Sequence, residues 1–274
     1  MNPRISLRCI QATIFLPAGI PQFTIAYCQV ESVLEQVISF KGVNKRYGRQ
    51  QVLCGIDLVV TRGQFLGLVG VNGAGKTTLI KCLLDFTSAD SGSIRIRGQD
   101  SSLTVARNNL AYLPEKFTPP YYLTGGDFLE YMARLHQVAH HQEQIESMLG
   151  ILDLDSSALA KPVRQLSKGM SQKLGLAACL LSNKELLIMD EPMSGLDPRS
   201  RAYLKQHLLE LKAGNKTLFF STHLLNDVEV LCDQVAVLHQ GRIRFIGSPA
   251  ECCRQFETDN FEQAYLKCIN SVKE

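Results

Sequence analysis

One strand, loop and helix constrain the fold of this chain more than any other feature of its sequence. The apolar run FLGLVG leads directly into the glycine-rich segment GVNGAGKTT, residues 70–78, and then into the apolar helix-type stretch LIKCLLD. Glycines allow a backbone to curl with successive N–H groups pointing inward, and the start of the following helix attracts negative charge. This order of elements predicts a P-loop that holds phosphate groups, rather than a glycine-rich turn that happens to contain a lysine.

The residues of this loop have separate predicted roles. Lys76 is expected to reach the β- and γ-phosphates of a nucleotide, and the hydroxyl of Thr77 is expected to bind Mg²⁺. The other loop residues predicted to contact the nucleotide are Gly70, Val71, Asn72, Gly73, Ala74, Gly75 and Thr78.

Two adjacent acids supply the second half of a phosphate site. In LLIMDEP, residues 186–192, they end an apolar strand, where acidic side chains are otherwise costly to place. Asp190 is expected to bind Mg²⁺, through water, and Glu191 is expected to accept a proton from the attacking water. The alternative is a strand that merely ends in two solvated acids, and the P-loop elsewhere in the chain makes it the less favoured one.

The order of apolar segments predicts a layered α/β domain. From residue 37 onward, short apolar runs alternate with amphipathic helical stretches. Four nearly continuous apolar runs predict buried parallel strands, whereas residues 37–43 and 51–60 alternate like a half-exposed antiparallel edge. Between about 117 and 181, helical spacing occurs without strands. The expected fold is therefore an α/β P-loop NTPase with a mainly parallel core sheet, an antiparallel N-terminal edge and an inserted helical subdomain.

A further segment narrows the class of P-loop protein. LSKGMSQKL, residues 166–174, closely resembles the signature sequence of ATP-binding cassette (ABC) proteins, and it lies upstream of the Asp190 strand as in that family. The resemblance continues with SGLD, residues 194–197, which is similar to the family's loop across the dimer interface. It implies an ABC ATPase domain over 37–247, with its helical subdomain at about 117–181, followed by a short helical tail over 248–274.

The resemblance also implies which residues meet the nucleotide of a second subunit. Ser167 and the backbone of Gly169, at a helix N-terminus, are expected at the γ-phosphate that the opposite subunit binds. The implied contacts from the same two segments further include Lys168, Met170 and Asp197. Taken alone, Ser167 is more simply a helix N-cap.

Two more residues resemble family positions. His223, directly after the apolar run TLFFST, is similar to the switch histidine, which hydrogen-bonds the γ-phosphate and orients Glu191 and water. A structural histidine that closes a strand is the alternative. Tyr47 matches the aromatic residue that stacks on adenine, although a tyrosine beside Gly48 is equally able to pack over a turn.

The chain departs from the common family pattern at Glu115 and at Lys168, the latter accompanied by Met170 and Lys173 in place of the usual glutamine and arginine. Glu115 in AYLPEK replaces the usual glutamine; it keeps an oxygen for Mg²⁺ but loses the amide donor. Lys168 replaces a glycine, and it either adds a cation near the transferred phosphate or points into solvent. YLPE and SKGM both resemble the exporter branch of the family, in which the membrane domain is a separate polypeptide.

The resemblance implies an ATPase cycle driven by ATP and Mg²⁺. Two chains, as a homodimer or a heterodimer with a second ABC ATPase, are expected to enclose two ATP molecules and to drive export by an integral membrane permease. FTPPYYLT, residues 117–124, offers aromatic side chains for docking that permease at the cytoplasmic face of the cell membrane. The alternative is a soluble regulatory or nucleic-acid-associated clamp; a catalytically inactive scaffold is disfavoured because every reacting position carries a competent side chain.

Composition adds little about partners. The formal net charge is +3 without a dense basic block, so no direct nucleic-acid contact is expected. The nine cysteines are scattered and odd in number, which fits reduced thiols in a cytosolic protein. Residues 9–30 carry no charge over roughly the length of a membrane span, but prolines and glutamines interrupt them. We expect residues 1–36 to be an extension that reflects an upstream-assigned start or a poorly ordered arm.

Overall fold

The computed structural model describes residues 7–12, 25–30, 35–139 and 141–271, and it divides the chain into two compact units, Met1–Glu35 and Gln36–Glu274. In the first unit, β1 (Leu7–Ala12) pairs antiparallel with β2 (Ile25–Val30). The rest of the predicted N-terminal extension lies outside the described residues. Among the helices that are described, none is both long and apolar enough to cross a membrane.

The second unit is built on a six-stranded sheet in the order β12-β11-β5-β10-β9-β8. Its strands are β5 (Phe65–Val69), β8 (Leu110–Leu113), β9 (Leu186–Asp190), β10 (Thr217–Thr222), β11 (Gln234–His239) and β12 (Arg242–Gly247). All adjacent pairs are parallel except β11 and β12. Every residue of β5, β9 and β10 is buried, because helices or a second sheet cover both faces of these strands. The predicted α/β fold with a mainly parallel core is confirmed.

A separate antiparallel sheet packs on this core. Its order is β4-β3-β6-β7, and its strands are β3 (Gln36–Tyr47), β4 (Gln50–Thr61), β6 (Ser91–Ile96) and β7 (Gln99–Asp100). The antiparallel N-terminal strands therefore form a sheet of their own instead of an edge of the core sheet. One apolar cluster joins this sheet to α1 (Lys76–Leu83) and to one face of the core, with the rings of Phe40 and Phe219 6.3 Å apart.

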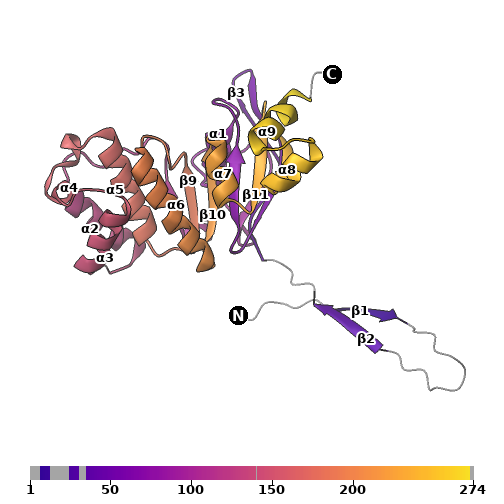
Figure 1. Ribbon diagram of the computed structural model, residues 1–274, viewed down its shortest axis with the longest axis horizontal. Coiled ribbons are helices and arrows are strands. Elements are labelled where there is room, and N and C mark those ends of the chain that lie inside the picture. Colours follow the sequence, from indigo (N-terminus) through magenta and orange to yellow (C-terminus); the bar gives the residue numbers. More distant parts are fainter. Residues whose placement is uncertain (1–6, 13–24, 31–34, 140, 272–274) are drawn as a thin grey trace, which may run out of the picture. The chain divides into compact units, whose positions relative to one another are not determined.

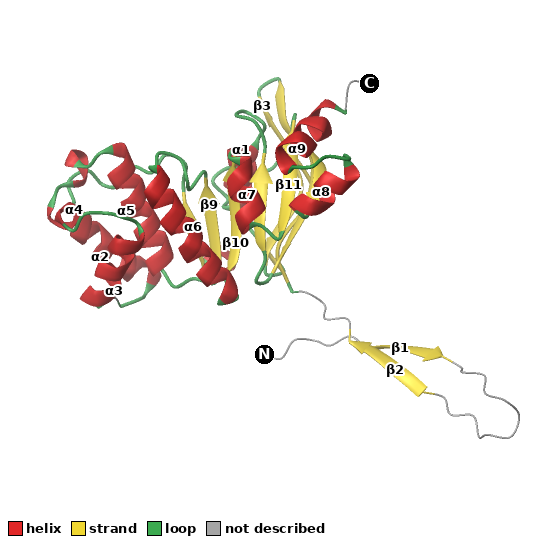
Figure 2. Cartoon of the chain, in the orientation of Figure 1, coloured by secondary structure: helices red, strands yellow, loops and turns green. Residues whose placement is uncertain are grey.

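The segment between β8 and β9 is helical. It contains α2 (Gly125–His136), α3 (Gln142–Ile151), α4 (Ser157–Ala160) and α5 (Lys168–Leu181), and these helices gather at one end of the unit beside α6 (Pro198–Ala213) (Figure 1). No strand is drawn among them (Figure 2). Helix α2 begins where Thr124 and Asp127 form a reciprocal capping box, which supplies acceptors for backbone N–H groups that a helix start leaves unpaired.

The chain then crosses back to the other end of the unit. Helix α7 (Leu225–Leu231) follows β10, and α8 (Pro249–Gln255) and α9 (Phe261–Asn270) lie near β11, away from α2 to α5 (Figure 1). The C-terminal helices contribute the fully buried Phe261 and Ala264 to the core on the second face of the sheet. The central strands thus carry their C-terminal ends to a common edge, where the glycine-rich loop and the acidic pair lie.

Candidate active site

The glycine-rich loop joins β5 to α1 and turns sharply at Gly75. This residue caps α1 with a φ of 111°, a conformation that side-chain-bearing residues rarely adopt. A Cβ atom there would stand 3.0 Å from both the carbonyl oxygen of Val52 and a methyl group of Leu53. Glycine is therefore required at this junction, and the close approach seats the loop against β4.

The loop forms one wall of a pocket of about 500 Å³. The pocket is lined by Val52, Val71, Asn72, Gly73, Gly75, Lys76, Thr77, Thr78, Glu115, Glu191, Ser194 and His223. The fold thus gathers most of the predicted phosphate loop, the predicted base, Glu115 and the predicted switch histidine. Of the predicted residues in and near the loop, Gly70, Ala74 and Asp190 are buried and do not line it.

A buried ion pair crosses this pocket. Lys76 Nζ lies 3.2 Å from Glu191 Oε1 and donates to the carbonyl oxygen of Gly70 at 2.7 Å. On the opposite side of the carboxylate, His223 Nδ1 lies 2.8 Å from Glu191 Oε2. Lys76 and Glu191 are only 6% and 7% exposed, so their attraction is weakly screened by water. The Glu191 carboxylate is held between two nitrogens, the Lys76 Nζ and the His223 Nδ1.

The backbone at Glu191 adopts an unusual conformation. Its φ is 51°, a left-handed value that costs free energy in a residue with a side chain. The Glu191 N–H lies within hydrogen-bond distance of both the carbonyl oxygen and the hydroxyl of Ser221, at 3.2 and 3.1 Å. These acceptors on the neighbouring strand β10 fix the turn that brings Glu191 into the pocket lining while Asp190 stays fully buried.

The oxygen atoms beside the pocket suit a hard divalent cation. Asp190 accepts a short hydrogen bond from the Ser221 hydroxyl through Oδ1, whereas its buried Oδ2 has no hydrogen-bond partner within the described part of the chain. Burial raises the pKa of Tyr112, and the charges of Asp190 and Glu115 raise it further, so both carboxylates lie near one ring. With the half-buried Thr77 hydroxyl, these groups match the oxygen ligands of Mg²⁺.

The protein supplies only part of such a coordination shell. Across residues 35–139 and 141–271, His, Cys, Asp and Glu side chains do not gather in threes as a metal site. Mg²⁺ commonly binds one or two protein carboxylates together with phosphate oxygens and water. The donor set therefore fits a cation that arrives with a phosphate ligand.

The segment predicted to meet a second subunit lies outside the pocket. Ser167 caps α5, with its hydroxyl accepting from the Met170 N–H at 3.2 Å. Ser167 and Lys168 are exposed, and no residue from 167 to 170 lines the pocket. Asp197 likewise lies outside it, capping α6 by accepting from the Ser200 N–H at 3.0 Å.

The predicted adenine contact is not part of the pocket wall. Tyr47 ends β3, is 48% exposed, and its ring centre lies 5.3 Å from Lys45 Nζ. Val52, on the paired strand β4, lines the pocket although sequence reasoning did not select it, because an apolar residue in a strand carries no functional signal. Ser194 also lines it, and the SGLD resemblance was the one signal that pointed to its segment.

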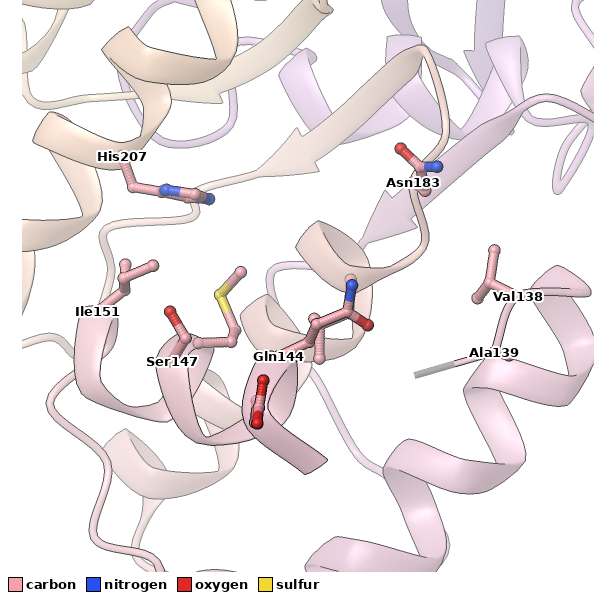
Figure 3. A pocket seen from close by; sticks show the side chains of 10 residues that line it. Val138, Ala139, Gln144, Ser147, Ile151, Asn183 and His207 are labelled. Atoms are coloured by element: carbon pink, nitrogen blue, oxygen red, sulfur yellow. The ribbon is translucent and has the colours of Figure 1, made fainter. Parts of the chain in front are cut away.

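A second hollow lies away from these groups. It measures about 670 Å³ and is lined by Gln144, Ser147 and Ile151 of α3 together with Asn183 and His207 (Figure 3). None of the predicted site residues lines it. The predicted site residues that line either of these two pockets therefore all lie in the smaller one.

Comparison with known proteins agrees with this geometry. The family described as ABC transporter matches residues 53–194, slightly more than half of the chain. The chain belongs to this family. It is 35% identical to Nod factor export ATP-binding protein I of Ralstonia nicotianae, over 78% of this chain and 68% of that protein. Its identification as an ABC transporter ATP-binding subunit is confirmed.

Two further comparisons set the extent of the likeness. The chain is 40% identical, over 72% of its length, to the uncharacterised ABC transporter ATP-binding protein sll0415 of Synechocystis, but it spans only 56% of that protein. A solved structure of an ATP-binding subunit of an ABC transporter superposes with a TM-score of 0.76 at 30% identity, covering 85% of this ABC chain and 99% of that one.

Proposed function

We propose that this chain binds and hydrolyses ATP with Mg²⁺ as one of a pair of ABC ATPases that drive export through a separate membrane permease. The observation that carries the proposal is the Lys76, Glu191 and His223 cluster in a pocket bounded by the glycine-rich loop. A pocket that is bounded by a glycine-rich loop and contains an ammonium group and an oriented carboxylate suits phosphoryl transfer to water.

Each side chain has a task that follows from its position. Lys76 places an ammonium group at the pocket, which stabilises the negative charge that develops on the transferred phosphoryl group. Glu191 accepts a proton from the attacking water through a carboxylate that His223, 2.8 Å away, holds in place. Mg²⁺, when bound, neutralises phosphate charge. Thr77, Asp190 and Glu115 would hold it.

The exposed start of α5 supports action in pairs. Ser167 and Lys168 stand at a helix N-terminus, which favours an anion, yet they lie outside the chain's own pocket. In the proposed pair, each copy presents this segment to the ATP bound by the other. The second copy is either an identical chain or a different ABC ATPase, and each chain alone is a poor ATPase.

Exposed aromatics support a membrane partner. Tyr121 and Tyr122 are 67% and 71% exposed and stack edge to face with ring centres 5.6 Å apart. Phe117, four residues before Tyr121, anchors the same segment by packing on Phe128, with ring centres 5.4 Å apart. Exposed apolar rings mark a protein contact, here with the permease. The chain would then work at the cytoplasmic face of the cell membrane.

The direction of transport is proposed as export. YLPE and SKGM resemble the exporter branch, and the relative from Ralstonia nicotianae carries an export name. The alternative, a soluble clamp that acts on nucleic acid, is not favoured, because the matched relatives carry transporter or export names.

The test is Mg²⁺-dependent ATP hydrolysis by the purified chain as its concentration rises. The proposal predicts a rate per chain that increases with concentration and is lost in Lys76→Ala and Glu191→Gln. A rate per chain that is independent of concentration, in a chain that sediments as a monomer, would contradict the paired mechanism. Equal hydrolysis by the wild type and both variants would contradict the site itself.

A further inference from the structure

A lysine that has no role in the proposed mechanism is buried in α5, the helix that begins within the signature-like segment of residues 166–174. Lys173, in α5, is only 9% exposed. An ammonium group that leaves water needs close partners, because an unpaired buried charge is strongly destabilising. Lys173 has two of them, and they come from different elements.

The partners of Lys173 join the helical segment to the loop after β9. Its Nζ lies 3.2 Å from Asp197 Oδ2 and donates to the carbonyl oxygen of Asp153 at 2.8 Å. Asp153 follows α3, and Asp197 caps α6. Lys173 therefore bridges the end of α3 and the start of α6 from its place on α5.

A second contact lies on the same face of α5, one turn earlier. A Cβ atom on Gly169 would stand 3.2 Å from the carbonyl oxygen of Gly195, so the helix backbone and the loop nearly touch. Residues four apart share a helix face. One face of α5 therefore packs on the loop of residues 194–197 at two points. Gly169 approaches the backbone of Gly195, and Lys173 forms an ion pair with Asp197.

The same loop reaches the phosphate pocket at its other end. Ser194 lines the pocket, and its N–H donates to the carbonyl oxygen of Glu191 at 3.0 Å. Three residues later, Asp197 is held by Lys173. The loop therefore connects the chain's own catalytic carboxylate to the helix that is offered to the second copy.

We propose that Lys173 is a positioning residue, which holds the Ser194–Asp197 loop against the first turns of α5 so that both segments meet the second copy as one surface. The inference rests on the proposed function in pairs. Hydrogen bonds from the Ser200 hydroxyl and N–H, and then the Lys173 ammonium, hold the pKa of Asp197 well below its usual range. The Asp197 carboxylate consequently stays ionised near neutral pH.

The test measures ATP-dependent pairing in a Glu191→Gln background by sedimentation velocity, alongside ATP affinity at a concentration where the chain is monomeric. Lys173→Gln is expected to raise the dissociation constant of the ATP-bound pair about 10-fold or more, the range of coupling between contacting residues. Monomer affinity for ATP should change less than about 2-fold, because Lys173 lies outside the pocket. Lys173→Arg should restore pairing.

Two further variants keep the test decisive. Asp197→Asn removes the same ion pair by changing its half-exposed partner, and asparagine caps helices as well as aspartate does. This variant should therefore weaken association of the two copies without unfolding the chain. Combined with Lys173→Gln, it should add little. Lys205→Gln is the matched control, because Lys205 of α6 forms an ion pair of the same kind with the buried Asp227 of α7, at 3.1 Å, and no residue of α5 takes part in it.

The outcomes separate this inference from the function on which it rests. If the Glu191→Gln parent pairs with ATP but Lys173→Gln and Asp197→Asn pair equally well, the positioning role is overturned and the paired function stands. Equal weakening by Lys205→Gln would also overturn it, since a general loss of stability would then explain the effect. A parent that never pairs with ATP overturns both.

Discussion

The phosphate pocket and the start of α5 each place the N-terminus of a helix at a functional segment, but their surroundings differ. At α1, the helix start lies at a pocket that also contains Lys76, Glu191 and His223. At α5, Ser167 is exposed and its hydroxyl is occupied by a backbone N–H of its own helix. One helix end therefore has its catalytic groups within the chain, while the other lacks them, as expected if each serves a different copy.

The largest effect should come from the cation in the pocket. Lys76→Ala is expected to lower ATP hydrolysis about 100- to 1,000-fold, because it removes the charge that stabilises the transition state. Lys81→Ala, at the exposed far end of the same helix, should leave the rate near that of the wild type. Steady-state phosphate release measures both. Comparable losses in the two variants would show that helix stability, and not the cation, decides the rate.

Glu191→Gln should separate binding from hydrolysis at the same pocket. An amide keeps the shape of the side chain but cannot accept the proton, so turnover should fall about 100- to 10,000-fold while ATP binding persists. Glu185→Gln, just before the same strand and paired with the exposed Arg97 at 2.8 Å, is the control. Isothermal titration and phosphate release together test the prediction. Rapid turnover by Glu191→Gln would refute its role as base.

Ser167→Ala should expose the difference between the two helix starts. If the Ser167 hydroxyl contacts the phosphate of the second copy as proposed, its loss should lower turnover about 10- to 100-fold, yet leave ATP affinity of the monomer unchanged. Thr124→Ala is a matched control, because Thr124 also caps a helix and each change should lower the free energy of unfolding by about 1 kcal/mol. A rate that falls equally in both variants would assign Ser167 a structural role alone.

Tyr47→Ala should have a smaller effect, which is limited to the affinity for ligands that contain a nucleobase. Stacking on an aromatic side chain contributes about 1 to 3 kcal/mol, so ATP affinity should fall about 5-fold or more. Tyr47→Phe should retain the affinity, and binding of inorganic tripolyphosphate should be the same in all three proteins. If tripolyphosphate binding weakens equally, Tyr47 acts on the fold of the β3 and β4 hairpin and not on adenine.

The smallest effect concerns acid stability at the exposed face. Because hydrogen bonds from Ser200 and the charge of Lys173 depress the pKa of Asp197, its ionised form stabilises the fold above the unfolded pKa of about 3.9, and this contribution is lost as pH falls below that value. Asp197→Asn should therefore show a shallower decline in the free energy of unfolding below about pH 4. Denaturant titrations at several pH values measure this difference. If the free energy of unfolding falls equally steeply with pH in the wild type and in Asp197→Asn, the linkage is contradicted.

Sequence reasoning predicted the strands with long apolar or long alternating runs, and it missed the short strand β6. β5, β9 and β10 were predicted because they are nearly continuous apolar runs, whereas β6 was not, since its first half is exposed. The acidic pair and the glycine-rich loop were predicted to act together, and the fold brings Lys76 and Glu191 to 3.2 Å. Strand order, which sets that distance, is not encoded in any local pattern.

The remaining differences depend on contacts between distant segments. The pocket wall contains Val52 and not Tyr47, because the hairpin pairing of β3 with β4 decides which side chain turns toward the loop. The pair of Lys173 with Asp197 joins residues that are 24 positions apart by way of a helix and a strand. Neither arrangement could be inferred from spacing, since both follow from tertiary packing.

The most direct test of the composite site mixes two inactive chains. Lys76→Ala lacks a working pocket, and Ser167→Arg places a bulky side chain at the start of α5, so each alone should be inactive. Mixed pairs combine the intact pocket of one with the intact α5 segment of the other. The account predicts recovery to about a quarter of the wild-type rate, because random pairing leaves one intact site in half of the pairs. No recovery, with mixed pairs shown by native mass spectrometry, would contradict it.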